Sequence, residues 1–152
     1  MEIRKEWLAP CGLYCGVCGI LIADRDNNQK FKERLASVYG VKPEDIRCTG
    51  CLAKKEDEVF FYCRTCPIKS CVQAHGYEGC HQCSAFPCKL IDEFPMPAGK
   101  KAILRAIPQW REWGTEKWVM EEEKRYKCPH CGYGLFRGAK RCRNCKEPVD
   151  LD

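Results

Sequence analysis

Residues 128–145 read CPHCGYGLFRGAKRCRNC, and this stretch decides how the C-terminal end of the chain is expected to fold. It holds two Cys-x-x-Cys pairs, Cys128 with Cys131 and Cys142 with Cys145, separated by ten residues. Two tight turns at this spacing can bring four sulfurs around one tetrahedral ion. Four thiolates leave no open coordination position, which is typical of a structural zinc rather than a hydrolytic one. The stretch therefore predicts a zinc ribbon.

The residues between and around these pairs fit the same interpretation. Gly132 has the conformational freedom that a turn needs just after its second sulfur, and residues 133–141 suit a hairpin. His130 is then a solvent-facing bystander. A module this small cannot bury enough apolar area to fold alone, so a bound zinc must stabilise it. Basic residues on the hairpin can touch phosphates, but we expect them to be solvated surface. They are Arg137, Lys140, Arg141 and Arg143.

The rest of the chain is also rich in cysteine, with 15 in 152 residues. Twelve of them form six Cys-x-x-Cys pairs: 15/18, 48/51, 63/66, 80/83, 128/131 and 142/145. Cys11, Cys71 and Cys88 are left over. The first residues contain no apolar run typical of a signal peptide, and no stretch reaches the roughly 20 apolar residues of a membrane span. We therefore expect a cytoplasmic protein, whose reduced thiols bind metal rather than form disulfides.

Charge gives little independent information about partners. The formal net charge is +5 with every cysteine counted as neutral. A metal-bound cysteine is a thiolate, so filling the sites would remove most or all of this positive charge. Nucleic-acid binding is therefore not predicted from net charge alone.

The N-terminal cysteines show an internal repeat. Residues 63–71 and 80–88 share the spacing Cys-x2-Cys-x4-Cys, seventeen residues apart. Eleven cysteines and one histidine, either His75 or His81, would supply three four-coordinate sites, making about four zinc ions with the ribbon. One partition assigns Cys15, Cys18, Cys48 and Cys51 to one ion, Cys63, Cys66, Cys80 and Cys83 to a second, and Cys11, Cys71 and Cys88 to a third. Alternatively, each repeat centres its own ion, and the sequence does not separate these pairings.

Between the cysteines, the sequence predicts helices. Asn28 to Tyr39 has apolar residues at helical spacing and is followed by Gly40, a stop signal. A short turn beginning at Pro43 follows as a connector. Residues 98–126 lack cysteine and predict two short helices around the breakers Pro108 and Gly114, whose tryptophans are expected in the core. The fold class predicted is a small α+β, metal-stabilised protein. Its parts are a cysteine-rich knuckle domain (1–96), a helical connector (97–126) and the ribbon (127–152).

A second metal chemistry stays open for the N-terminal domain. Cys11, Cys15 and Cys18 have the Cys-x3-Cys-x2-Cys spacing that holds a four-iron cluster in radical S-adenosylmethionine enzymes. Those enzymes build the cluster onto a barrel of strand–helix units, which this chain lacks the length and strand pattern to form. An iron–sulfur cluster on another scaffold remains the alternative to zinc.

Several cysteine motifs together resemble a known family. Residues 10–18 read Pro-Cys-Gly-Leu-x-Cys-Gly-x-Cys, and they are followed by Cys48-Thr49-Gly50-Cys51, the Cys-x2-Cys-x4-Cys segment and a Phe86-Pro87-Cys88-Lys89-Leu90 tail. In this order they resemble an uncharacterised domain-of-unknown-function family of small cysteine-rich proteins, found largely in anaerobic bacteria and archaea. Some members carry a C-terminal zinc ribbon, and the resemblance covers essentially the whole chain. It implies a cytoplasmic metal-binding protein and no particular reaction.

These observations favour a zinc-binding interaction module over an enzyme. A nucleophilic cysteine needs a base and an orienting partner, and the chain's three histidines form no recognisable constellation with one. The expected partner is another protein, with nucleic acid as a further possibility and no membrane. The alternative function is an iron–sulfur redox or electron-transfer protein. The question of catalysis stays open.

Overall fold

The computed structural model describes residues 2–152 and is helical. Helices make up 51% of it, and the described residues contain no strand or sheet. The α-helices are α1 (Gly19–Arg25), α2 (Gln29–Tyr39), α3 (Phe61–Arg64), α4 (Pro67–Ala74), α5 (Lys89–Asp92), α6 (Pro97–Trp113) and α7 (Thr115–Arg125). Short 3₁₀ turns are η1 (Lys5–Trp7), η2 (Cys15–Val17), η3 (Pro43–Asp45), η4 (Glu56–Glu58) and η5 (Cys80–Gln82). None of the helices within residues 2–152 is both long and apolar enough to cross a membrane.

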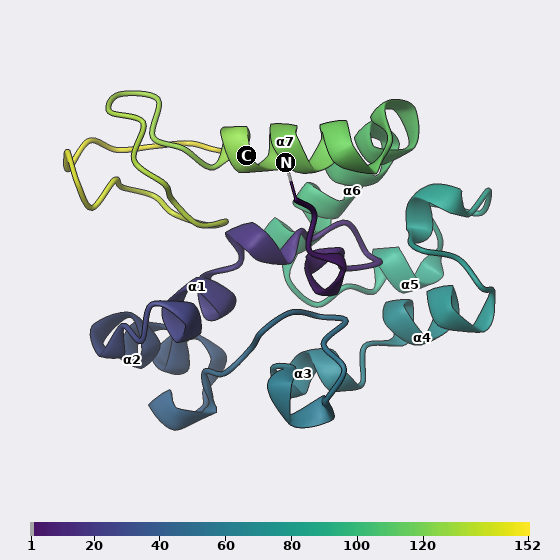
Figure 1. The fold of residues 1–152 in the computed structure, drawn as a ribbon, viewed down its shortest axis with the longest axis horizontal. Coiled ribbons are helices and arrows are strands. Elements are labelled where there is room, and N and C mark those ends of the chain that lie inside the picture. The colour runs from purple at the N-terminus through teal and green to yellow at the C-terminus, as the bar shows by residue number, and fades with distance from the viewer. Residues whose placement is uncertain (1) are drawn as a thin grey trace.

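The predicted α+β class with a zinc ribbon is therefore wrong. After α7 the chain forms two compact loops, each closed by one isolated antiparallel bridge, Lys127 with Gly134 and Arg141 with Pro148 (Figure 1). Residues 133–141 do not pair as the expected hairpin, because some of their backbone amides bond carbonyls in other parts of the chain. The Leu135 amide bonds the Tyr126 carbonyl at 2.8 Å. Each loop pairs only with its own flank, so no ladder long enough for a strand develops.

The prediction of a helix after Asn28 is confirmed by α2. The Asn28 side chain accepts a hydrogen bond of 3.1 Å from the Phe31 amide, which satisfies a donor at the helix N-terminus. Gly40 ends the helix in the left-handed conformation, with φ of 69°. Phe31 and Ala36 are buried and face α1 and the turn at η3. Helix α2 is thus held at both ends by local sequence signals.

We expect Asn28→Ala to lower the free energy of unfolding by about 1 kcal/mol, because the Phe31 amide loses its acceptor. Chemical denaturation measures this change. Asn28→Asp keeps an acceptor at the same position and should stay within a few tenths of a kcal/mol of the parent protein. An alanine variant as stable as the parent would show that the cap contributes nothing.

Helices α6 and α7 form the upper layer of the molecule in Figure 1. Helix α6 runs through Pro108 rather than breaking there. Pro108 and the residue one turn before it, Leu104, both lie on the exposed face, where water can satisfy the carbonyl that Pro108 leaves unbonded. Gly114, with φ of 79°, ends α6 and starts α7. The expected breakers therefore act differently: Gly114 separates the helices and Pro108 does not.

The main core is built around an aromatic stack. Trp110 of α6 lies between His81 and Trp118 of α7, with ring centroids 3.8 and 4.1 Å away and nearly parallel planes. Tyr14 meets Trp118 edge-on at 5.9 Å. Trp110 and Trp118 are almost completely buried, as expected, whereas Trp113 is only partly so. The stack joins the N-terminal half of the chain to α6 and α7.

A polar network holds the C-terminus against these helices. Arg105 of α6 pairs with the buried Glu122 of α7 and, at 3.1 Å, with Asp152. Tyr126 donates a hydrogen bond to Asp152, and Lys101 donates one of 2.9 Å to the Asp152 backbone carbonyl. The buried carboxylate of Glu122 is thus paired, as burial of a charge requires. Both ends of residues 127–152 are fixed to the helical layer.

Candidate metal centres

The C-terminal cysteines form a tight group. The sulfurs of Cys128, Cys131, Cys142 and Cys145 all lie within 4.8 Å of one another. Two of the sulfur pairs, 128/145 and 131/142, are 3.6 Å apart. Sulfurs around a tetrahedral zinc with bonds of about 2.3 Å lie about 3.8 Å apart, so four thiolates in this arrangement fit one ion. This group can hold a metal ion; His130 lies outside it and is exposed.

Hydrogen bonds to the sulfurs favour their thiolate forms. The His130 amide donates to the Cys128 sulfur at 3.4 Å, and the Asn144 amide donates to the Cys142 sulfur at the same distance. The Asn144 side chain donates to the Cys131 sulfur at 3.5 Å, and this bond is the main cause that lowers the pKa of Cys131 to about 6. Metal binding requires deprotonated sulfur. The loops therefore favour the thiolates of Cys131 and Cys142. At Cys145 a backbone hydrogen bond at Glu147 lowers the pKa, but burial and the neighbouring cysteines outweigh it and raise the pKa to about 12.

Both loops use the same turn geometry. The Gly132 amide bonds the Cys128 carbonyl at 2.8 Å, and the Lys146 amide bonds the Cys142 carbonyl at 2.9 Å. Gly132 and Lys146 both have positive φ, 77° and 70°. The conformational freedom expected of Gly132 is thus used, whereas Lys146 adopts the left-handed conformation despite its side chain.

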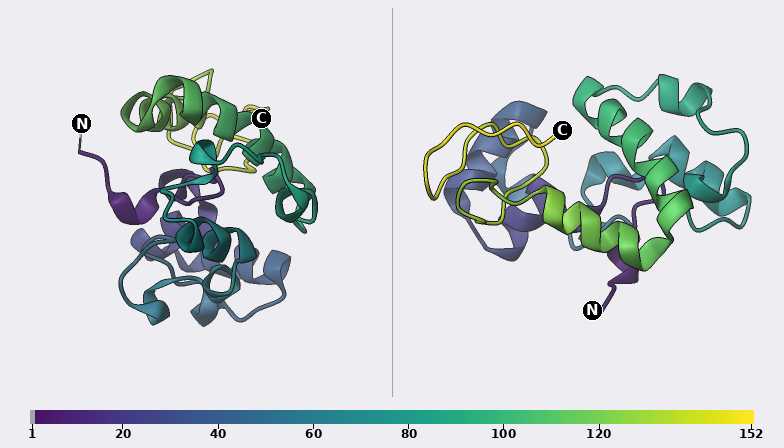
Figure 2. Two further views of the ribbon diagram at one scale, coloured as in Figure 1. Left: turned by 90° about the vertical axis from the view of Figure 1, so that its right-hand side faces the viewer. Right: turned by 90° about the horizontal axis from the view of Figure 1, so that it is seen from above.

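The C-terminal module, residues 127–152, packs on the N-terminal half through its first loop. The Arg137 amide donates to the Val17 carbonyl at 2.8 Å, and the Arg137 side chain donates to the Tyr14 carbonyl at 3.0 Å. Phe136 packs on Phe31 of α2, with ring centroids 4.7 Å apart. Figure 2 shows the module over α1 and α2. The expectation of a solvated side chain is therefore wrong for Arg137, which is partly buried.

Arg137 also faces N-terminal cysteines. Among the residues that the structure describes, it makes no ion pair with a carboxylate. Burial lowers its pKa, but the nearby Cys18, Cys15 and Cys11 thiolates contribute to a net rise above its ordinary value. A desolvated guanidinium stabilises anionic sulfur. No local sequence signal reveals this role, because the contact joins residues more than a hundred positions apart.

Seven N-terminal cysteines share one neighbourhood. They are Cys11, Cys15, Cys18, Cys48, Cys51, Cys63 and Cys66. The Cys51 amide donates to the Cys15 sulfur at 3.3 Å. Burial first, and then the Cys11 thiolate, raise the pKa of Cys51 to about 12, so its thiol is neutral at pH 7 unless a metal ion displaces the proton. Within residues 2–152, no other set of three or more potential ligands is gathered as closely as the C-terminal four.

The other four N-terminal cysteines gather beside these seven, and Cys80 lies near Cys11. Cys71, Cys80, Cys83 and Cys88 line one small cavity of about 30 Å³. Of the two histidines named as a twelfth ligand, His75 lines this cavity with its Nδ1 3.8 Å from the Cys71 sulfur, whereas His81 does not line it. His75 donates its Nδ1 hydrogen to the Cys71 carbonyl at 2.8 Å, and His81 lies in the tryptophan stack. Burial lowers the pKa of His81, which favours its neutral form.

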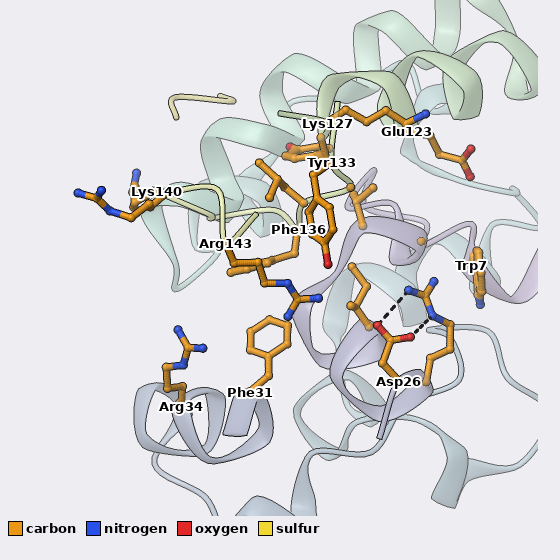
Figure 3. A pocket seen from close by; sticks show the side chains of 18 residues that line it. Trp7, Asp26, Phe31, Arg34, Glu123, Lys127, Tyr133, Phe136, Lys140 and Arg143 are labelled. Atoms are coloured by element: carbon orange, nitrogen blue, oxygen red, sulfur yellow. Dashed lines mark hydrogen bonds and ion pairs between the residues drawn. The ribbon is translucent and has the colours of Figure 1, made fainter. Parts of the chain in front are cut away.

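An open groove of about 620 Å³, here called the basic groove, lies where the C-terminal module meets α1 and α2 (Figure 3). Six cationic side chains line it: Arg25, Arg34, Lys127, Lys140, Arg141 and Arg143. Only two acidic residues do so, and Asp26 pairs with Arg25 at 2.9 Å while Glu123 accepts a hydrogen bond from Tyr14. The Arg143 guanidinium lies 5.9 Å from the Phe31 ring and 5.7 Å from the Tyr133 ring. Of the groove residues, the sequence pattern indicates Lys140, Arg141 and Arg143 as able to touch phosphates, but neither Lys127 nor the aromatic and arginine residues opposite them.

Comparison with known proteins identifies a family but no activity. The family described as "Protein of unknown function (DUF3795)" matches residues 7–93. The resemblance expected along the whole chain is thus shown for the N-terminal cysteine-rich region, and the C-terminal four-cysteine group lies outside the match. No curated protein and no solved structure matches the chain. Since the matched residues make up more than half of the 152, this chain belongs to the DUF3795 family of proteins of unknown function.

Proposed function

We propose that this protein is a zinc-thiolate scaffold that binds single-stranded nucleic acid in the basic groove. The observation that carries the zinc assignment is the group of four sulfurs within 4.8 Å of one another. An all-sulfur tetrahedral donor set selects soft or borderline ions such as zinc over magnesium or calcium. The four ligands leave no position for a substrate, so the ion stabilises structure.

Charge in the groove supports an anionic partner. Arg25 is neutralised by Asp26, whereas the other groove cations make no ion pair with a carboxylate among the described residues. These cations are Arg34, Lys127, Lys140, Arg141 and Arg143. Five cations that line one groove repel each other, although the Arg141 guanidinium also donates to the Lys146 carbonyl. Phosphates along a strand would relieve this repulsion. Zinc bound by four thiolates carries a net charge of about −2 and offsets only part of it.

Aromatic surfaces in the groove favour unpaired bases over duplex. Tyr133 is 39% exposed, and Figure 3 shows the Arg143 guanidinium between Tyr133 and Phe31. Bases of a single strand stack on aromatic rings and arginine planes, whereas bases in a duplex are already stacked on each other. Phe31 is buried, so the groove offers the Tyr133 ring and the Arg143 plane for stacking, beside cations that can follow a phosphate backbone. The acidic surface of a folded protein partner could pair with these cations, but it would have no bases to stack on Tyr133 and Arg143.

Arg143→Ala is expected to weaken binding of a single-stranded oligonucleotide by roughly 5- to 150-fold, since a stacking contact contributes about 1–3 kcal/mol. The slope of log affinity against log salt should also become shallower by about 0.7. Fluorescence anisotropy with a labelled mixed-sequence oligonucleotide, over a series of salt concentrations, measures both quantities. Zinc content, measured on the same sample, checks that the neighbouring ligands still hold their ion.

Lys117→Ala is the matched control, because this cation lies on α7, contacts Trp113 and does not line the groove. It should leave affinity within about twofold of the parent, as expected of a change outside the binding surface. If the parent protein fails to bind the oligonucleotide at low salt, or if both variants behave alike, the nucleic-acid assignment is wrong. A protein partner would then be the remaining occupant for the groove.

A further inference from the structure

The small cavity near α4 and α5 brings together four cysteines that are spread over 18 residues of the sequence. Cys71 comes from the middle of α4 and Cys80 from turn η5, while Cys83 follows that turn and Cys88 precedes α5. The remaining walls are largely apolar side chains, including Ile68, Val72, Phe86 and Ile91. A space of about 30 Å³ is comparable to the volume of one water molecule.

Hydrophobic packing alone does not explain why four cysteines line such a small space. Cysteine can act as a small buried hydrophobe, but core packing gives no reason for four sulfurs to face one cavity. The structure contains no disulfide among its described residues, since all fifteen cysteines are free. A cation bound among these sulfurs would give all four a common partner.

The backbone around the cavity is fixed in a way that suits chelation. The Cys83 amide bonds the Cys80 carbonyl at 3.0 Å, which closes a tight turn with a sulfur at each end. Arg111 of α6 holds this turn with hydrogen bonds of 2.8 Å to the His81 carbonyl and 2.9 Å to the Cys83 carbonyl. The Cys80 amide is bonded to the Pro10 carbonyl at 2.9 Å. The turn therefore presents its two sulfurs from a backbone anchored on both sides.

We propose that Cys71, Cys80, Cys83 and Cys88 together bind one zinc ion in this cavity. Among the described residues these sulfurs are more widely spaced than the C-terminal four, so closing them on one ion requires rotation about their Cα–Cβ bonds. The assignment rests on the proposed zinc-thiolate scaffold. It replaces the division in which Cys80 and Cys83 share an ion with Cys63 and Cys66. It leaves the seven other N-terminal cysteines for other ions, although Cys11 lies beside Cys80.

The test counts zinc per chain in the full-length protein and in three variants. The double variant Cys71→Ser with Cys88→Ser should lose about one zinc, because two of four ligands are gone, while Cys142→Ser should lose about one from the C-terminal group. Val72→Ala is the matched control: it removes two methyl groups from the cavity wall but no ligand, so it should keep the parent's zinc content despite lower stability.

The outcomes separate this assignment from the proposed function. If the double variant keeps all its zinc while Cys142→Ser loses one, the cavity assignment is overturned and the C-terminal zinc stands. If neither loses zinc, both fail. Alkylation of the native parent protein gives a readout that needs no variant to fold. The cysteines of the cavity should be protected from iodoacetamide and become reactive together when a chelator removes zinc; if Cys71 and Cys88 react fully in the zinc-loaded protein, the assignment is wrong.

Discussion

Cys142→Ser is expected to release the C-terminal ion and unfold residues 127–152. The apolar core of this module is small, consisting of Leu135, Ala139, Val149 and the cysteines themselves. Such a core cannot stabilise 26 residues alone, and structural zinc in small domains contributes an apparent roughly 10–16 kcal/mol at pH 7. Cys142 is completely buried and its sulfur accepts hydrogen bonds from two backbone amides. Serine at this position would lack the soft thiolate that the ion requires.

Limited proteolysis with zinc analysis measures this effect. Protease should cut the variant between residues 127 and 152 while α6 and α7 resist, because those helices have their own aromatic core. Oligonucleotide binding should also fall, since Tyr133 and Arg143 of the basic groove belong to the module. His130→Ala is the control and should change neither zinc content nor cleavage, because His130 is exposed and outside the sulfur group. A Cys142→Ser protein that keeps its zinc and its protease resistance would contradict this account.

Trp110→Ala should lower the free energy of unfolding by about 3–5 kcal/mol, the typical effect of removing a large aromatic side chain from a core. Trp110 is 1% exposed and lies between His81 and Trp118. Its indole also donates a hydrogen bond of 2.9 Å to Thr115, which joins the end of α6 to the start of α7. The alanine variant loses the stack, the packing and this bond together.

Urea denaturation followed by circular dichroism measures the loss. Trp113→Ala is the matched control on the same helix: Trp113 is only partly buried, and the Lys117 ammonium lies 5.3 Å from its ring centroid. Its replacement should cost about 1 kcal/mol or less. Equal losses for the two variants would mean that the stack is not the centre of the core.

The parts of this structure that the sequence predicts are those with local signals. Helix α2 is bounded by a capping asparagine and a glycine whose positive φ ends it, and both features can be recognised within 13 residues. The two C-terminal Cys-x-x-Cys turns are similarly local, and Gly132 indicates the turn geometry of the first. The absence of strands was missed because the Leu135 amide bonds Tyr126 and the Arg137 amide bonds Val17, so residues 133–141 form no ladder of their own.

The grouping of the N-terminal cysteines depends on long-range packing. The repeated spacing at 63–71 and 80–88 suggested equivalent halves, yet Cys63 and Cys66 lie with the first cysteines while Cys80 and Cys83 lie with Cys71 and Cys88. The contact of Arg137 with Tyr14 and the basic groove likewise join distant segments. Such contacts leave no periodic pattern in one sequence. The boundaries at 96 and 126 and the assignment of all fifteen cysteines as ligands stay predictions.

Elemental analysis of protein purified without oxygen, together with its ultraviolet–visible spectrum, tests the central claim most directly. It counts zinc, iron and labile sulfide per chain in one sample. We predict zinc at no fewer than about two ions per chain, one in the C-terminal group and one in the cavity, with neither iron nor sulfide and no visible absorbance. Protein free of zinc would contradict the scaffold, and iron with sulfide would instead identify the N-terminal thiols as ligands of an iron–sulfur cluster.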